Sequence, residues 1–143
     1  MPRHAEPREF VLSEYQRSRY RLFAGLCVAA AALSLLDLVA DFDESFIPVA
    51  VMVTALFAGW FAWLKAGRPF ARLTPHGLTI HDGVLLPWSA SWTSVYAIEA
   101  PGDRRAELKL SGSRLRRVPL TMIEREDRQA FVEAVRTWIH TSH

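Results

Sequence analysis

Two long apolar runs, at about residues 20–40 and 46–64, lie only five residues apart in this chain of 143 residues. A bilayer core is about 30 Å thick and a helix rises about 1.5 Å per residue, so about twenty apolar residues cross it. Hydrocarbon offers no hydrogen-bond partners, so a spanning segment must pair its backbone groups internally, as a helix does. The sequence therefore predicts an N-terminal transmembrane hairpin of two helices over residues 20–64.

Charged residues are distributed unevenly around this hairpin. Residues 1–22 hold five Arg and three Glu, a net charge of +2, and residues 65–143 hold twelve basic and eight acidic side chains, a net charge of +4. Residues 23–64 hold four acids and no Lys or Arg, a net charge of −4. Lys and Arg beside membrane spans favour the cytoplasmic side. We expect a multi-pass protein of the inner (plasma) membrane with both termini cytoplasmic, comprising a lead-in at 1–19, the hairpin and a domain at 65–143.

A cleaved signal peptide is the main alternative interpretation of the first apolar run. The run is longer than the usual apolar core of about 7–15 residues, and a second run follows at once. Asp37 lies within one helical turn of the acids at residues 41–44. This position favours a carboxylate at the outer interface over a proton path through the membrane. Cys27, the only cysteine, is expected to be a small packing residue.

Small residues recur at helical spacing within both runs. Gly25 and Ala29 in the first run, and Ala55 and Gly59 in the second, form pairs four residues apart. Lipid supplies no hydrophobic drive between helices, so close approach of backbones at small residues holds them together. We expect these four residues to pack the two helices against each other. Packing between copies, in a dimer or a larger ring, is the alternative.

The domain at 65–143 is predicted to consist of short strands followed by one helix. The strands are expected at residues 70–74, 78–81, 84–88, 94–100, 106–110 and 114–120. Asp82-Gly83 is a strong signal for a tight hairpin turn, because both residues tolerate positive φ. Ser89–Thr93 is expected to form a turn, and Leu115, Val118 and Leu120 compete for the core of the domain.

The C-terminal helix is the clearest element of this domain, from about residue 124 to 141. Apolar residues recur on one helical face at positions 131, 132, 135, 138 and 139. A seventh strand is predicted before the hairpin, at Phe10–Ser13, because an open six-stranded barrel would expose a pairing edge. A helix that begins near residue 9 and runs directly into the first span is the alternative.

Several short motifs resemble the bacterial PH-like membrane proteins, in which two transmembrane helices precede a small pleckstrin-homology-like β-barrel. The motifs are Leu73-Thr74-Pro75-His76-Gly77-Leu78-Thr79-Ile80, Leu86-Pro87-Trp88, the terminal helix and the lead-in from Val11 to Arg17. The resemblance implies an α+β membrane protein with a cytoplasmic PH-like β-barrel of six or seven strands, capped by the C-terminal amphipathic helix. In that family an Asp-Ile pair usually follows the Trp, whereas Ser89-Ala90 follows Trp88 here. The family is largely uncharacterised, so the resemblance implies no activity.

Motifs of catalysis and metal binding are missing from the sequence. It contains no G-x-S-x-G, P-loop, H-E-x-x-H, C-x-x-C or dinucleotide fingerprint. His76 and His81 flank an expected turn, but two His alone do not make a metal site. We expect no catalytic residue, no metal, no cofactor and no enzymatic activity.

Basic residues are the remaining functional signal, and they form two sets. The first set flanks the membrane spans and is expected to anchor the hairpin or to face anionic lipid: Arg17, Arg19, Arg21, Lys65, Arg68 and Arg72. The second set is expected to be either a solvated strand face or a face for an anionic ligand or an acidic partner: Arg104, Arg105, Arg114, Arg116 and Arg117. Nucleic acid is not expected as a partner, because eight acids accompany the twelve basic residues of the domain.

Two functions from different classes remain after these exclusions. The first is a membrane-anchored interaction module that presents a PH-like domain at the inner leaflet. Such a module binds anionic lipid or a protein partner, for example as an immunity or accessory subunit, or it self-associates. The alternative is a ligand-gated membrane effector, whose barrel senses a small anionic messenger and whose hairpins then oligomerise. About 74 residues leave little room for an internal ligand cavity in such a barrel.

Overall fold

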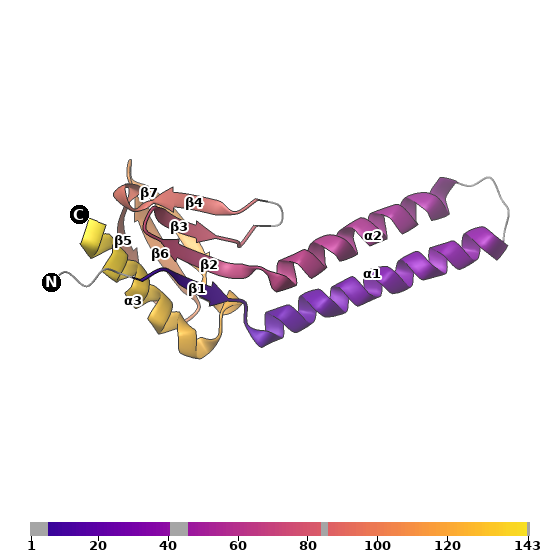
Figure 1. Ribbon diagram of the computed structural model, residues 1–143, viewed down its shortest axis with the longest axis horizontal. Coiled ribbons are helices and arrows are strands. Elements are labelled where there is room, and N and C mark those ends of the chain that lie inside the picture. The colour runs from indigo at the N-terminus through magenta and orange to yellow at the C-terminus, as the bar shows by residue number, and fades with distance from the viewer. Residues whose placement is uncertain (1–5, 41–45, 84–85, 143) are drawn as a thin grey trace. The chain divides into compact units, whose positions relative to one another are not determined.

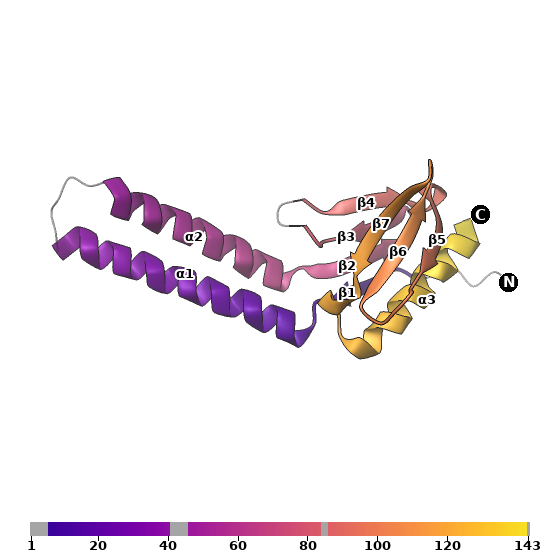
Figure 2. The ribbon, with the colours of Figure 1, turned by 180° about the vertical axis from the view of Figure 1, so that it is seen from behind.

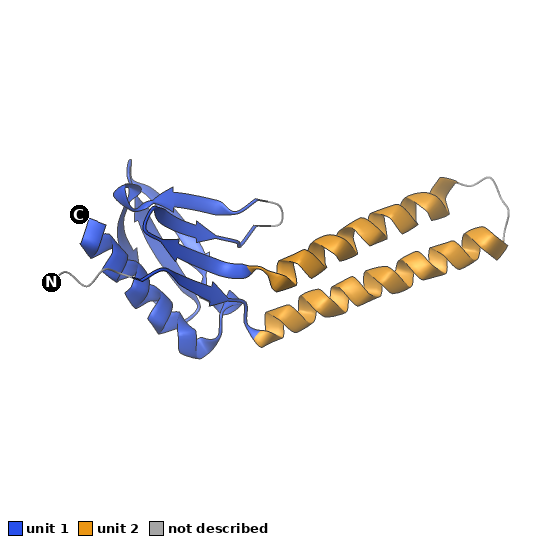
Figure 3. Ribbon diagram, viewed as in Figure 1, with its two compact units in different colours: residues 1–13, 69–143 blue, residues 14–68 orange. Residues whose placement is uncertain are grey.

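The computed structural model describes residues 6–40, 46–83 and 86–142, which form two compact units (Figures 1 and 3). The hairpin unit is Glu14–Arg68, and the sheet unit combines Met1–Ser13 with Pro69–His143. The architecture is α+β, with two long apolar helices, two antiparallel sheets and a C-terminal helix. The elements are β1 (Arg8–Val11), α1 (Glu14–Ala40), α2 (Phe46–Gly67), β2 (Pro69–Thr74), β3 (Gly77–Ile80), β4 (Trp88–Ser91), η1 (Trp92–Ser94), β5 (Val95–Glu99), β6 (Arg105–Leu110), β7 (Arg114–Pro119), η2 (Leu120–Met122) and α3 (Arg125–Ser142).

The hairpin unit consists of α1 and α2, which lie side by side (Figures 1 and 2). Both are long and apolar enough to cross a membrane. Each extends beyond its predicted span, by six residues before residue 20 in α1 and by three residues after residue 64 in α2. The acidic residues 41–45 between them lie outside the described residues.

Small residues form the contact between α1 and α2. The buried residues are Ala24, Cys27 and Ala31 on α1 and Gly59, Ala62 and Ala66 on α2. A Cβ atom built on Gly59 would stand 3.0 Å from the Cβ of Cys27. The prediction that small residues pack the two helices is therefore correct for Gly59.

The prediction is wrong for Gly25 and Ala29, which are exposed on α1, while Ala55 is half-buried on α2. The contact stripe on α1 begins at Ala24 and continues at Cys27, with spacings of three and four residues. Successive helical residues are rotated by about 100°, so Gly25 points away from a stripe that contains its neighbour. Small size alone does not distinguish these two adjacent stripes.

The sheet unit holds seven strands within the described residues, arranged as two antiparallel sheets. The first sheet has the order β1-β2-β3-β4 and the second β5-β6-β7. The core lies between the sheets and α3, and its largest fully buried side chains include Phe70, Leu73, Ile80, Leu108 and Phe131. Buried residues alternate along β3 and β6, as expected for sheets with one covered face, whereas β2 buries Phe70, Ala71 and Leu73.

Helix α3 covers this core through its predicted apolar face. The side chains of Phe131, Val132, Val135, Trp138 and Ile139 are all buried. The ring of Phe131 makes edge contacts with Phe10 and Phe70, at centroid distances of 5.2 and 6.4 Å. The ring of Trp138 stacks on Trp92 at 5.6 Å. Residues that precede the hairpin in the sequence and residues that follow it therefore meet on one face of α3.

Strand β1 precedes the hairpin and completes the first sheet. It covers Arg8–Val11 rather than the expected residues 10–13, so Leu12 and Ser13 lie beyond it. The ladder ends early because a bulge follows Phe10 and Val11 then pairs with Pro69, which has no backbone N–H. Leu12 is nevertheless buried, and the N–H of Ser13 donates to the carbonyl oxygen of Met122 at 2.8 Å.

The connection between β3 and β4 differs from the predicted tight turn. Ile80 pairs with Trp88, so seven residues, 81–87, connect the strands in place of the two-residue turn at Asp82-Gly83. The strand begins at Trp88 because Pro87 cannot donate to a ladder. Residues 84–85 of the predicted strand lie outside the described residues, and the predicted turn at Ser89–Thr93 is strand β4 up to Ser91.

The remaining strands agree with their predicted positions within two residues, and α3 lies within one residue of the predicted helix. Val118 and Leu120 are buried as expected, but Leu115 is 49% exposed. Leu115 pairs with Lys109 on the face of the second sheet that is turned away from the core. Of the three residues that compete for the core, Val118 and Leu120 therefore enter it and Leu115 does not.

Candidate interaction surface

Most residues of the first basic set lie near the start of α1 or the end of α2. Five of its six members belong to the hairpin unit, namely Arg17, Arg19, Arg21, Lys65 and Arg68. The guanidinium carbon of Arg19 lies 5.7 Å from the ring centroid of Tyr15, and Nζ of Lys65 lies 5.4 Å from that of Tyr20. Both pairs place a cation over an aromatic face at the end of a helix that carries the apolar run.

Arg72, the sixth member, belongs to β2 in the sheet unit. Its Nε lies 2.7 Å from a carboxylate oxygen of Glu9, and the two residues are cross-strand partners of β1 and β2. Both side chains are 52% exposed, so the pair contributes little stability, at most about 1 kcal/mol. The pair does neutralise the charge of Arg72.

The second set of basic residues does not form a single face. Arg105 pairs with Pro119 at one end of the β6–β7 ladder, and Arg114 pairs with Leu110 at the other end. Five residues along a strand correspond to about 17 Å, so these two cations do not share one small anionic group. Arg117 pairs with Glu107 and lies 3.7 Å from its carboxylate.

Arg116 is engaged in contacts within the sheet unit. Its guanidinium donates to both carboxylate oxygens of Asp82, at 2.9 and 2.7 Å, and its carbon lies 5.4 Å from the ring centroid of Trp88. A bidentate pair of this kind is directional, and the side chain of Asp82 is only 13% exposed. Arg116 therefore ties the β3–β4 loop and the start of β4 to β7.

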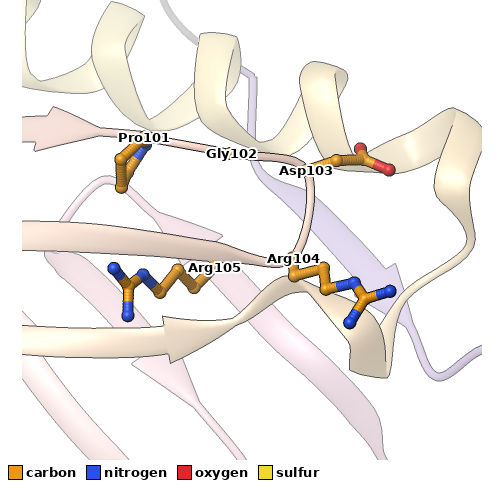
Figure 4. Close-up of a pocket in the computed structure, with 5 residues that line it drawn as sticks. All are labelled: Pro101, Gly102, Asp103, Arg104 and Arg105. Carbon is orange, nitrogen blue, oxygen red and sulfur yellow. The ribbon is translucent and has the colours of Figure 1, made fainter.

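Arg104 and Arg105 belong instead to a cluster at the end of the β5–β6 loop, residues 100–104, and at the first residue of β6, Arg105 (Figure 4). Asp103 accepts from Nη1 of Arg128 at 3.1 Å and lies 3.3 Å from Nε of Arg125. Nη1 of Arg128 also donates to the carbonyl oxygen of Asp103 at 3.1 Å. We call Arg104, Arg105, Arg125 and Arg128, with Asp103 among them, the loop arginine cluster.

The loop is held at both of its sides. The N–H of Leu120 donates to the carbonyl oxygen of Arg104 at 2.9 Å, and Arg128, with a side chain only 17% exposed, holds Asp103. Arg104 and Arg105 are exposed, and neither has an ion-pair partner within the described residues. Two cations are thus presented from a loop whose backbone is fixed.

A groove of about 240 Å³ runs from this loop along α3. Leu120 and Val132 are its buried apolar residues. The groove itself is lined by two cations, Arg128 and Arg136, and two acids, Asp103 and Glu133, whereas Arg104, Arg105 and Arg125 are not part of its lining. Three further acids, Glu124, Glu126 and Asp127, lie at the start of α3.

Sequence reasoning missed Arg125 and Arg128. Their only signal is a spacing of three residues on the first turn of α3, which places both on one helical side. The partner of both is Asp103, which lies 22 and 25 residues earlier in the chain. Only the folded arrangement brings this loop to the helix.

The β2–β3 motif that carries the family resemblance has a structural role. The hydroxyl of Thr74 donates to the carbonyl oxygen of Gly77 at 3.1 Å, and Nε1 of Trp92 donates to the carbonyl oxygen of Thr74 at 2.7 Å. A Cβ atom on Gly77 would stand 2.2 Å from the carbonyl oxygen of Ala90. Thr and Gly at these positions are thus explained by the turn and by the close approach of β4.

Among the described residues, no group of three or more His, Cys, Asp or Glu side chains is arranged to hold a metal ion. No family model, curated protein or solved structure matches this chain. The resemblance to PH-like membrane proteins therefore stays a prediction from short motifs.

Proposed function

We propose that this chain is a non-enzymatic interaction module anchored in the inner membrane. In this proposal α1 and α2 cross the membrane as a hairpin, both termini are cytoplasmic, and the sheet unit is a PH-like domain at the inner leaflet. The domain binds an acidic surface of a protein partner, as an immunity or accessory subunit does, or anionic lipid. The arginines of the loop cluster supply the charge for this binding.

The observation that carries the proposal is the exposure of large apolar side chains on α1 and α2. Only 17% and 11% of the residues in their most apolar stretches are buried. Leu26, Leu33 and Leu36 on α1 are each at least 60% exposed, as are Phe57 and Trp60 on α2. A helix in the core of a soluble protein buries such side chains, whereas a membrane span leaves them to lipid.

The layout of the sheet unit supports the PH-like interpretation. The four strands and three strands of the two sheets, followed by one amphipathic helix, agree in number and order with the proposed barrel of six or seven strands and its cap. The space between the sheets and α3 is occupied by side chains such as Phe70, Leu108 and Phe131, each fully buried. A ligand must therefore bind on the outer surface, which favours the interaction module over an effector with an internal messenger site.

Membrane topology is the first test of the proposal. Alkaline phosphatase fused after His143 is expected to be inactive, and a fluorescent protein at the same place is expected to be bright, because both report a cytoplasmic C-terminus. The fusion proteins should also stay with the membranes in alkaline carbonate. An active phosphatase, or release by carbonate, contradicts the proposed anchoring.

Binding by the loop arginine cluster is the second test. The double variant Arg104→Glu/Arg105→Glu is compared with Arg114→Glu, since Arg114 is also exposed but lies at the far end of the β6–β7 ladder. Detergent-extracted full chain is used for in-cell crosslinking to proteins and for flotation with vesicles of anionic or zwitterionic lipid. We expect loss of a stoichiometric protein partner, or of anionic-vesicle binding, in the double variant alone. Equal binding by all three proteins excludes the cluster as the binding face.

A further inference from the structure

We propose that the β3–β4 loop inserts Leu86 into the lipid–water interface and so gives the chain a third contact with the membrane. This inference rests on the proposed insertion of α1 and α2. Its own basis is the position of the loop in the sheet unit and the chemistry of its described residues, 81–83 and 86–87.

Strand register places this loop at the end of the sheet where the chain arrives from the hairpin. Strand β2 begins at Pro69, and its residue Ala71 pairs with Ile80, the last residue of β3. The N–H of His81, the first residue of the loop, donates to the carbonyl oxygen of Phe70 at 2.7 Å. Strand β1 ends at this edge as well, because Val11 pairs with Pro69. The loop thus leaves the sheet beside both connections to the helices.

These connections are too short to let this end of the sheet move far from the helix ends. One residue, Arg68, separates α2 from β2, and two residues, 12 and 13, separate β1 from α1. At about 3.6 Å per extended residue these links span at most about 7 and 11 Å. Neighbouring strands are about 4.8 Å apart, so Ile80 at the end of β3 lies about 5 Å from Ala71, which is two residues, or about 7 Å, beyond the start of β2. This limit holds at any angle between the two units.

The bilayer surface is close to the end of α2. The apolar run of α2 ends at Leu64, three residues before its last residue, Gly67, which corresponds to about 5 Å of helix. The headgroup region adds about 5–7 Å to each side of the hydrocarbon core. A loop of seven residues that leaves the sheet at this end therefore has the length to reach the interface.

Leu86 is suited to that position. Its side chain is 82% exposed, the largest fraction among the exposed large apolar side chains of the described residues. Pro87 beside it is exposed as well, and the nearest described acid, Asp82, is held by Arg116 in a bidentate pair. Transfer of such a leucine from water to an apolar environment is favourable. A single exposed leucine is ordinary on a soluble surface, and the register is what distinguishes this one.

Both described ends of the loop are held by contacts. Arg116 of β7 contacts Asp82 in the first part of the loop and the ring of Trp88, which follows the loop. Trp88 itself pairs with Ile80. Both ends of the loop are therefore attached to strands, and insertion orders fewer residues than it would in a free loop.

Site-specific fluorescence in vesicles tests the inference. Cys27 is the only cysteine, so Cys27→Ala gives a background without thiols, and Leu86→Cys is labelled there with the polarity-sensitive dye NBD. The matched control is His76→Cys, exposed in the turn at the opposite end of β2 and β3. Leu33→Cys on α1 reports insertion of the hairpin. The labelled full chains are reconstituted into phosphatidylcholine–phosphatidylglycerol vesicles that contain nitroxide lipids.

We expect a blue shift at residue 86 and loss of most of its fluorescence with nitroxides near the headgroups. Residue 76 should keep its emission, and residue 33 should be quenched by nitroxides deep in the acyl chains. If the dye at residue 33 is quenched while the dye at residue 86 is as bright as the dye at residue 76, the inference is overturned and the proposed membrane anchoring is still supported. Equal quenching at 76 and 86 overturns it as well, since the whole unit then lies on the surface. If the dye at residue 33 is not quenched, α1 is not inserted in the bilayer, and both the proposed anchoring and the inference are contradicted.

Discussion

In the hairpin of α1 and α2 the buried residues are small, whereas in the unit built from the sheets and α3 they are large. Ala24 and Gly59 are typical of the first, and Phe70 and Phe131 of the second. Charged side chains cover the sheet unit, while large apolar side chains cover the helices. The difference shows that one chain follows two packing rules. Burial of large apolar groups stabilises the sheet unit in water, and close backbone contact joins the helices.

The largest expected effect contrasts two phenylalanines. Phe131→Ala removes a fully buried ring that contacts Phe10 and Phe70, and such changes cost about 3–5 kcal/mol. Phe57→Ala in α2 removes a ring that is 65% exposed and should leave the hairpin nearly unchanged. Urea unfolding of the full chain in detergent, followed by protease resistance of residues 70–143, measures both. Similar losses for the two variants contradict the contrast.

The second prediction concerns strand β1, which belongs to the sheet unit although it precedes the hairpin. Phe10→Ala removes a ring that is 7% exposed and should cost about 3 kcal/mol of unfolding free energy in the sheet unit. Deletion of residues 1–13 should lower the protease resistance of residues 70–143 and leave carbonate-resistant membrane association intact. Val11→Ala, at a 45% exposed position of the same strand, is the control. Unaltered resistance after the deletion would mean that β1 is dispensable for the sheet unit.

Features of local origin were predictable from the sequence. Helix α3 follows from an apolar stripe of period 3.6, and α1 and α2 follow from their apolar length. Strand β1 was predicted from the need to protect a sheet edge, and its position differs by two residues because Pro69 interrupts the ladder.

Features that depend on contacts distant in the sequence were not predictable. The pair of Asp82 with Arg116 joins residues 34 positions apart, and the pairing of Ile80 with Trp88 leaves a seven-residue loop where a two-residue turn was predicted. Arg116 and Arg117 are neighbours on β7 and point to opposite sides of the strand, so their adjacency in the sequence does not place them on one face. The loop arginine cluster forms instead, since Arg125 and Arg128 meet Asp103 only after α3 packs.

The third prediction contrasts two glycines within the hairpin. Gly59→Leu places a side chain where a Cβ atom already meets Cys27 at 3.0 Å, and overpacking of this kind costs about 1–3 kcal/mol. Gly25→Leu meets no atom within 4 Å of its Cβ and is the matched control. Alkylation of Cys27 by a maleimide in detergent reports the contact, because Cys27 is buried beside Gly59. We expect faster alkylation for Gly59→Leu only. Equal rates in the two variants would mean that α1 and α2 do not pack through Gly59.

The smallest expected effect contrasts two tryptophans with different polar contacts. Trp92 is 2% exposed, and its indole N–H donates to the carbonyl oxygen of Thr74 at 2.7 Å. Trp92→Phe keeps an aromatic ring against Trp138 but leaves that carbonyl without its donor, which costs about 1 kcal/mol.

Trp60 of α2 provides the comparison, because it is 62% exposed and a helix pairs its own backbone groups. Trp60→Phe should therefore change neither the unfolding midpoint of the sheet unit nor the alkylation rate of Cys27. Hydrogen exchange at the Thr74–Gly77 turn should rise in Trp92→Phe alone, since Trp92 is the side chain that holds the Thr74 carbonyl from β4 and η1. Unchanged exchange at this turn would show that the hydroxyl of Thr74 and the β2–β3 ladder hold it without the indole.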